Sequence, residues 1–220
     1  MKFDAILFDM DGVIVDTEHL HSKAELATCA ANNLSVPLSE WDHFRGKTTR
    51  TIFEYIVSNY SKRPLDVEYL INHKTENYLA LASKEAVLIP GSVEFLKWMR
   101  PRVSRAALAT SSKRVIQELM FDMFGLEQYF DSVITGDDVK NGKPNPEPYL
   151  KAAESVGVPI GRCAVIEDSD SGITSAKNAG AYPIGITTSY DSKRLLNAGA
   201  RKTFATFKEI SDFLESGGFL

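Results

Sequence analysis

The sequence near residue 9 places two acids at the end of a short apolar run. Residues 5–8 read AILF, and Asp9, Met10, Asp11 and Gly12 follow directly. A run of this length is too short for a helix core and predicts a strand covered on both faces, as in a parallel sheet. Because side chains alternate along an extended chain, we expect Asp9 and Asp11 on one side and Met10 on the other. Gly12 lets the chain bend away at the carboxyl end of the strand, where open α/β sheets bind ligands.

The two acids predict a metal ion. Carboxylates this close repel each other, which raises the pKa of one of them unless a cation or a shared proton offsets the charge. Mg2+ prefers oxygen ligands, so we expect it as a cofactor at Asp9 and Asp11. A solvated Asp-x-Asp-Gly turn explains the same residues, and this alternative stays open here. A calcium loop is excluded, because its pattern needs an acid where Val13 stands.

The composition is that of an ordinary globular protein, with 220 residues, 44% of them hydrophobic and 25% charged. The formal net charge of -4 argues against a nucleic acid as partner, because proteins that bind nucleic acids carry a basic surface. No apolar run approaches the about 18 residues of a membrane span, and the first residues do not resemble a signal peptide. We therefore expect no membrane partner and a cytoplasmic location. Cys29 and Cys163 show no Cys-x-x-Cys spacing and are expected as buried thiols.

The hydrophobic pattern changes along the chain. Residues 17–84 show helical periodicity without a convincing strand, which predicts a small helical bundle. From residue 87 onward strands alternate with helices, which is typical of the α/β class with a doubly wound, mostly parallel sheet. The expected strands are 4–8, 105–109, 132–135, 163–166 and 182–186, the expected helices are 92–100, 113–123, 146–156 and 171–179, and a strand and a helix close the chain in 202–215.

The first strand has no immediate partner in the sequence, so the simplest topology lets the helical segment leave the sheet and return to it. We expect an α/β core domain formed by residues 1–15 and 87–220, with an all-helical cap domain inserted at residues 16–86. An insertion directly behind two carboxylates is expected to act as a lid over them.

Three further strand ends carry reactive or charged side chains. Thr110 and Ser111 follow a strand and lead into a helix, an arrangement that suits phosphate. Lys143 lies in a loop stiffened by glycine and proline, which aims its charge. Glu167 and Asp168 follow another strand and can add metal ligands. Each has a simpler explanation in isolation, as a helix cap or an exposed turn, but a doubly wound sheet brings all four strand ends together.

The sequence resembles the haloacid dehalogenase (HAD) superfamily of phosphatases and phosphotransferases through Asp9-x-Asp11-Gly12-Val13, Thr110, Gly142-Lys143-Pro144 and Glu167-Asp168-Ser169. The resemblance runs over essentially the whole chain and includes a helical cap after the first motif. It is similar to the branch that contains beta-phosphoglucomutase and small sugar-phosphate phosphatases. The resemblance implies a Rossmann-like core and an enzyme that depends on Mg2+.

The resemblance also implies a role for each of these residues. Asp9 would attack phosphorus and form an aspartyl phosphate, while Asp11 would protonate the leaving oxygen and later take a proton from the acceptor. The implied Mg2+ ligands are Asp9, the backbone carbonyl of Asp11, and Asp168, with Glu167 beside it or behind it. The implied phosphate-binding residues are Thr110, Ser111 and Lys143.

The cap is expected to choose the acceptor. His21, Arg50 and Lys74 match cap positions that in the mutase relatives serve proton transfer and the binding of a second phosphate. Their simpler explanation is that such residues on helices are often surface groups. Gly46-Lys47-Thr48 imitates the end of a P-loop, but Trp41 stands where that motif needs its first glycine, so we reject a P-loop.

The expected substrate is a small phosphorylated metabolite, with a sugar phosphate preferred. Attack by water makes a phosphatase, and attack by a sugar-phosphate hydroxyl makes a beta-phosphoglucomutase. The segment 45–50 favours the phosphatase, whereas His21 with Lys74 favours the mutase. A different class is a non-catalytic module resembling a phosphorylated receiver domain, which would not need the helical insertion. The sequence leaves the oligomeric state open, as a monomer or an oligomer.

Overall fold

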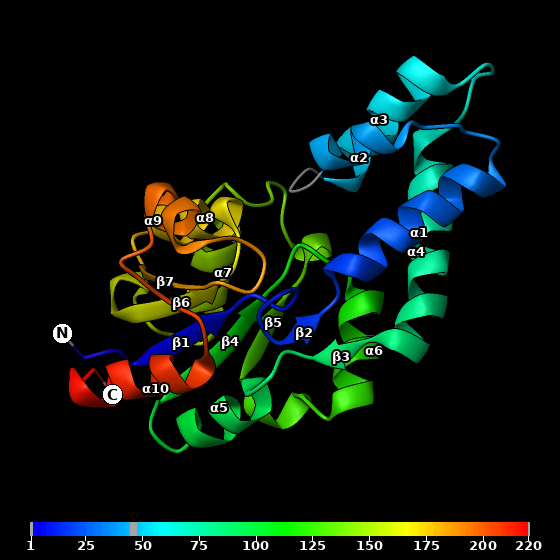
Figure 1. The fold of residues 1–220 in the computed structure, drawn as a ribbon. Helices are drawn as coiled ribbons and strands as arrows, with labels where there is room; N and C mark the ends of the chain where they lie inside the picture. The colour runs from blue at the N-terminus through cyan, green and yellow to red at the C-terminus, as the bar shows by residue number, and fades with distance from the viewer. Residues whose placement is uncertain (1, 45–47, 220) are drawn as a thin grey trace. The chain divides into compact units, whose positions relative to one another are not determined.

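The computed structural model describes residues 2–44 and 48–219, and its contacts divide the chain into two compact units (Figure 1). The first, which we call the α/β unit, comprises Met1–Asp16 and Val87–Leu220. The second, the helical unit, comprises Thr17–Ala86. Each unit is described by itself below.

A six-stranded parallel sheet forms the centre of the α/β unit, in the order β5-β4-β1-β6-β7-β8. The strands are β1 (Ala5–Phe8), β4 (Arg105–Ala109), β5 (Ser132–Ile134), β6 (Cys163–Glu167), β7 (Tyr182–Ile186) and β8 (Lys202–Phe204). The predicted α/β class with a doubly wound parallel sheet is confirmed. Phe8 pairs with Leu108 on one side and Ile166 on the other, so the carboxyl ends of three strands lie next to one another. The residues that follow these strands are thereby gathered at one edge.

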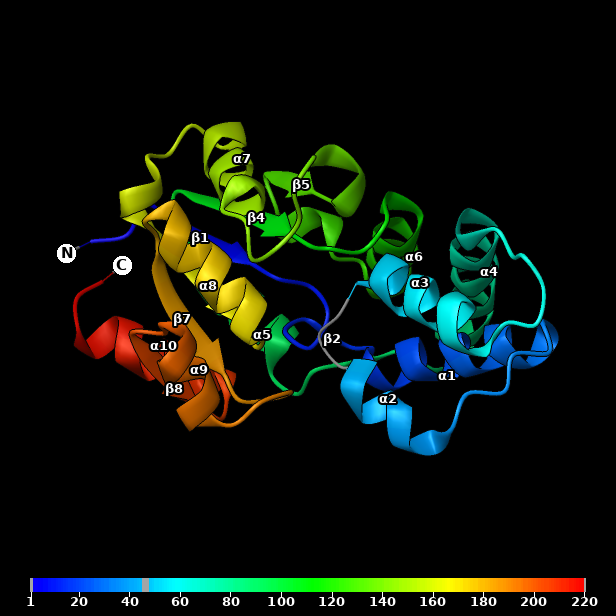
Figure 2. The ribbon, with the colours of Figure 1, turned by 90° about the horizontal axis from the view of Figure 1, so that it is seen from above.

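Helices cover both faces of this sheet. Helices α7 and α8 lie against one face, and α5 and α10 pack together on the other (Figures 1 and 2). The helices of this unit are α5 (Ser92–Met99), α6 (Arg114–Phe124), α7 (Glu147–Ser155), α8 (Asp170–Ala179), α9 (Ser192–Ala198) and α10 (Phe207–Ser216). Short 3-10 turns lie at Glu127–Tyr129, Gly136–Asp138 and Ile160–Arg162. Leu7, Tyr149 and Val165 belong to the apolar core between the sheet and α7.

The helical unit consists of α1 (Glu18–Ala31), α2 (Leu38–Phe44), α3 (Thr49–Tyr60) and α4 (Val67–Glu85). Helices α1 and α4 lie side by side (Figure 1), and α3 packs on α4. Phe53, Ile56 and Leu70 are fully buried in the core between these helices. Within the described residues of 17–86 the regular elements are helices and none is a strand, as the periodicity of this segment predicts.

Several short elements were not predicted from the sequence, α2 among them. The strands β2 (Val15–Asp16) and β3 (Val87–Leu88) pair antiparallel where the chain leaves and re-enters the α/β unit. Two residues are too few to show an alternating pattern. Helix α9 was also missed, because seven residues with few apolar positions give no clear helical period.

Both cysteines are buried free thiols, as expected. Burial raises the pKa of Cys29 and of Cys163 to about 12, so neither is a reactive thiolate. None of the helices in the described part of the chain combines the length and apolar character needed to cross a membrane.

Candidate active site

A buried lysine lies between two carboxylates at the carboxyl edge of the sheet. Lys143 comes from the loop before α7, Asp9 follows β1, and Glu167 ends β6. The Lys143 Nζ atom lies 2.6 Å from Asp9 Oδ1 and 2.7 Å from Glu167 Oε1. The Lys143 side chain is only 5% exposed. Burial by itself would lower the pKa of Lys143, but the charges of Asp9 and Glu167 outweigh burial and raise it well above its usual value. The amine is therefore held as a cation.

Three acids meet beside this lysine. Carboxylate oxygens of Asp9, Glu167 and Asp168 all lie within 4.8 Å of one another, and all three residues are buried. Burial, together with the neighbouring carboxylates, raises the pKa of Asp9 to about 7 even though Lys143 acts in the opposite direction. The pKa of Asp168 is raised for the same reasons. Three carboxylates against one ammonium form a site that fits a hard divalent cation, because such an ion has oxygen ligands and would offset the remaining charge.

Asp168 is held against the first motif by Gly12 and two hydroxyls. Gly12 has φ +74, and a Cβ there would lie 2.0 Å from Asp168 Oδ2, so the close approach requires glycine. The Thr188 hydroxyl donates to the Gly12 carbonyl at 2.5 Å, and the Ser189 hydroxyl donates to Asp168 Oδ2. Sequence analysis missed Thr188 and Ser189. They follow a predicted strand, as Thr110 does, but the helix behind them, α9, was not predicted, so only half of the signal that identified Thr110 was present.

Glu167 is already engaged by protein donors on both oxygens. Its Oε1 accepts hydrogen bonds from Lys143 and from the Tyr149 hydroxyl, the latter at 3.0 Å. Its Oε2 accepts from the backbone N–H of Asp168, and from the backbone N–H and hydroxyl of Ser169, each at 2.9 Å. The carboxylate thus has a fixed orientation. Tyr149 gave no signal in the sequence, where it reads as an apolar position of a helix.

Asp11 faces the hydroxyls after β4. Its Oδ2 accepts hydrogen bonds from Thr110 at 3.1 Å and from Ser112 at 2.8 Å. Ser111, expected at this site, is exposed, while Ser112 is buried. The two-residue alternation that places Asp9 and Asp11 on one side applies here too, since Thr110 and Ser112 are also two residues apart. Applying it would have selected Ser112 from the sequence.

The three candidates in the helical unit separate into a contacting pair, of which Lys74 is buried and His21 partly buried, and an exposed residue. Lys74 is 4% exposed, and its Nζ lies 2.7 Å from His21 Nδ1. The His21 ring stacks on Tyr78, with centroids 4.5 Å apart. Arg50 is exposed and forms ion pairs with glutamates of α3 and α4. Of the rejected P-loop candidate, Gly46 and Lys47 lie outside the described residues.

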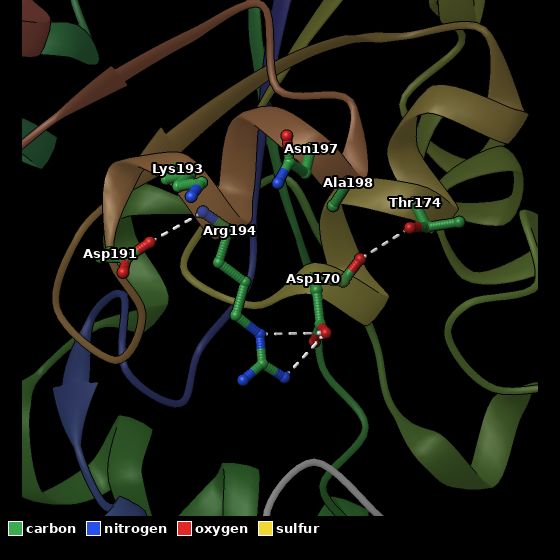
Figure 3. A pocket seen from close by; sticks show the side chains of 7 residues that line it. All are labelled: Asp170, Thr174, Asp191, Lys193, Arg194, Asn197 and Ala198. Atoms are coloured by element: carbon green, nitrogen blue, oxygen red, sulfur yellow. Dashed lines mark hydrogen bonds and ion pairs between the residues drawn. The ribbon is translucent and has the colours of Figure 1, made fainter.

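A surface hollow of about 480 Å³ lies between α8 and α9 (Figure 3). It is lined by Asp170, Thr174, Asp191, Lys193, Arg194, Asn197 and Ala198. Arg194 Nε and Nη2 donate to Asp170 Oδ2 at 3.1 and 2.8 Å, so its charge is already neutralised. None of the three clustered acids, Asp9, Glu167 and Asp168, is among the described residues that line this hollow. We therefore place the candidate active site at the acid cluster and not in the hollow.

Comparison with known proteins identifies the family. Residues 6–186 match the family model described as haloacid dehalogenase-like hydrolase. The chain belongs to this family. The hydrolase is 36% identical over 208 residues to a phosphorylated carbohydrates phosphatase of Thermotoga maritima, covering 90% of this chain and 92% of the relative. It is 33% identical over 187 residues to the fructose-1-phosphate phosphatase YqaB of Escherichia coli K12, covering 84% and 97%.

Among solved structures, a candidate beta-phosphoglucomutase of Thermotoga maritima is similar to this hydrolase over 98% of this chain and 99% of the other, with 32% identity and a TM-score of 0.78. The resemblance to the HAD superfamily and the expectation of an enzyme are thereby confirmed. A non-catalytic receiver-like module is disfavoured, because the family match is to hydrolases and spans both units.

Gly172 is a position where this hydrolase should not tolerate a methyl group. A Cβ there would lie 1.6 Å from Glu167 Oε1, so Gly172→Ala should lower the free energy of unfolding by about 1–3 kcal/mol. Urea denaturation measures this difference. The matched control is Gly161→Ala, because nothing lies within 4 Å of an added Cβ there. Equal stability of the two variants would contradict the placement of Glu167.

Proposed function

We propose that this hydrolase is an Mg2+-dependent phosphatase of small phosphorylated metabolites, with sugar phosphates as the preferred class. The observation that carries the proposal is the buried Lys143 ammonium 2.6 Å from Asp9 Oδ1, beside the acid cluster. This arrangement puts a nucleophile and a cation together where a phosphoryl group can be bound. The two phosphatase relatives support the choice of substrate class. We also propose that the protein is located in the cytoplasm.

In the first half-reaction, an Asp9 oxygen attacks phosphorus, and the bond between phosphorus and the ester oxygen breaks. Asp11 gives its proton to that oxygen, so the product leaves as a neutral alcohol. Asp9 then carries the phosphoryl group as an aspartyl phosphate. In the second half-reaction, Asp11 takes a proton from water and the water oxygen attacks phosphorus. The bond between phosphorus and the Asp9 oxygen breaks, which releases inorganic phosphate and restores the Asp9 carboxylate.

Lys143 and Thr110 bind the phosphoryl oxygens in this mechanism. Lys143 is held as a cation, so it can offset negative charge that develops on those oxygens. Thr110 and Ser112 donate to Asp11, and these contacts support phosphate binding beside the proposed proton donor. Ser111 is exposed on the same segment and would contribute to phosphate binding only through its backbone N–H.

Asp9 and Asp168 would hold Mg2+ through side-chain oxygens, and Asp11 through its backbone carbonyl. Glu167 would lie behind these ligands without contacting the ion, because both of its carboxylate oxygens accept hydrogen bonds from protein donors. When bound, the ion supplies positive charge that offsets the charge of the phosphoryl group.

The helical unit is proposed as the cap that selects the substrate through His21, Arg50 and Lys74. The contact between the buried Lys74 and the partly buried His21 supports a role for these two, since burying an ammonium costs free energy. Arg50 is exposed and ion-paired with glutamates of α3 and α4, and it is proposed to contact a distal group of the substrate in exchange for these pairs.

Asp9→Asn should remove turnover and leave the fold intact, because the amide oxygen is a poor nucleophile and the side chain keeps its size. Release of phosphate from an aryl phosphate should fall by at least about a thousandfold. Circular dichroism checks the fold. The matched control is Asp122→Asn, an exposed acid of α6 that should keep the wild-type rate. A wild-type rate in Asp9→Asn would show that Asp9 is not the nucleophile.

Removal of divalent ions with a chelator should stop phosphate release, and added Mg2+ should restore it, because three buried carboxylates and a phosphate dianion otherwise face one ammonium. A titration of Mg2+ by calorimetry should show weaker binding to Asp168→Asn than to the wild type. Full activity in the presence of chelator would exclude the proposed cofactor.

A mutase is the second candidate, supported by the similarity to the structure of a candidate beta-phosphoglucomutase. Incubation with beta-glucose 1-phosphate and a trace of the bisphosphate separates the two activities. We expect free phosphate as the product. Accumulation of glucose 6-phosphate without free phosphate would overturn the phosphatase and favour the mutase.

A further inference from the structure

Tyr149 is a fully buried tyrosine that contacts Glu167 and Lys143 from the apolar core. It lies near the start of α7, in the apolar core that also contains Leu7 and Val165. An apolar side chain would suffice for packing there. A buried hydroxyl costs free energy unless it is hydrogen-bonded, and the Tyr149 hydroxyl donates to Glu167 Oε1 at 3.0 Å. The hydroxyl therefore serves a polar contact inside the core.

Two donors share the same Glu167 oxygen. Oε1 accepts from Lys143 at 2.7 Å as well as from Tyr149, while backbone N–H groups hold Oε2. The Lys143 Nζ atom also lies 4.9 Å from the centre of the Tyr149 ring, over its face. The ammonium is thus bounded by Asp9, Glu167 and an aromatic ring.

The shared oxygen sets how strongly Lys143 is drawn toward Glu167. With the Tyr149 hydroxyl present, part of the negative charge on Oε1 is taken up by a second donor. Without that hydroxyl, Lys143 alone would satisfy Oε1, and its contact with Asp9 would weaken. The position of the only ammonium in this buried cluster of described groups therefore depends on Tyr149.

We propose that Tyr149 is a positioning residue, which holds the Lys143 ammonium between Asp9 and Glu167 through its hydroxyl and its ring. The catalytic part of this inference rests on the proposed phosphatase function. Because Lys143 acts on the phosphoryl oxygens as charge develops, its displacement should slow the chemical step more than it weakens substrate binding.

The test replaces the hydroxyl and the ring in turn. Tyr149→Phe keeps the ring, and Tyr149→Leu removes both. We expect Tyr149→Phe to lower kcat about tenfold, with KM within about twofold of wild type, and Tyr149→Leu to lower kcat further. The matched control is Tyr129→Phe, which changes another buried tyrosine of the α/β unit. Tyr129 lies before β5, at the amino end of that strand, whereas the candidate active site lies at the carboxyl ends of the strands. This control should keep the wild-type kcat.

A second readout does not depend on activity. The ammonium signal of Lys143, identified in nitrogen-15 NMR spectra by its loss in Lys143→Met, should shift in Tyr149→Phe and stay in place in Tyr129→Phe. A wild-type protein that releases no phosphate would refute the proposed phosphatase, and the NMR shift alone would then decide whether Tyr149 positions Lys143.

Two results would overturn the positioning role. One is an unshifted Lys143 signal in Tyr149→Phe, whatever happens to the rate. The other is an active wild type in which Tyr149→Phe keeps kcat within about twofold, or changes kcat and KM to the same extent while its melting temperature falls. A loss of kcat at constant KM together with a shifted signal supports the inference.

Discussion

The ammonium of Lys143 is the interaction on which the rest of the site depends. Three carboxylates gather at the carboxyl edge of the sheet, and in a buried setting their mutual repulsion is only weakly screened. Lys143 contacts two of them directly and supplies the single positive charge among these side chains. Burial and the neighbouring carboxylates raise the pKa of Asp9 to about 7, and the contact with Lys143 acts in the opposite direction and limits the rise.

Close approaches of the backbone make this convergence of charge possible. Gly12 and Gly172 each leave room for a carboxylate, of Asp168 and Glu167 respectively, where a side chain would overlap it. Hydroxyls and backbone N–H groups then set the orientation of each acid. A phosphatase needs such fixed groups, because electrostatic stabilisation is largest when charges do not have to reorganise during the reaction.

Sequence reasoning predicted the strands of the parallel sheet and most of the helices of the α/β unit because these elements are long enough to show a period. It located Asp9, Thr110, Lys143 and Asp168 for the same reason, since each follows a predicted strand or precedes a predicted helix. It selected Ser111 where Ser112 makes the contact with Asp11. It missed β2, β3 and α9, which are too short to give a pattern.

The sequence alone determined that this chain forms a doubly wound parallel sheet and that four polar strand ends meet at one edge, because periodicity and strand direction are local properties. Only the tertiary structure decided which atoms meet there. Tyr149 and Ser189 reach Glu167 and Asp168 across distances in sequence that no periodicity describes. Their partners are set by the packing of α7 on the sheet and by the course of the chain after β7, which depend on the whole core at once.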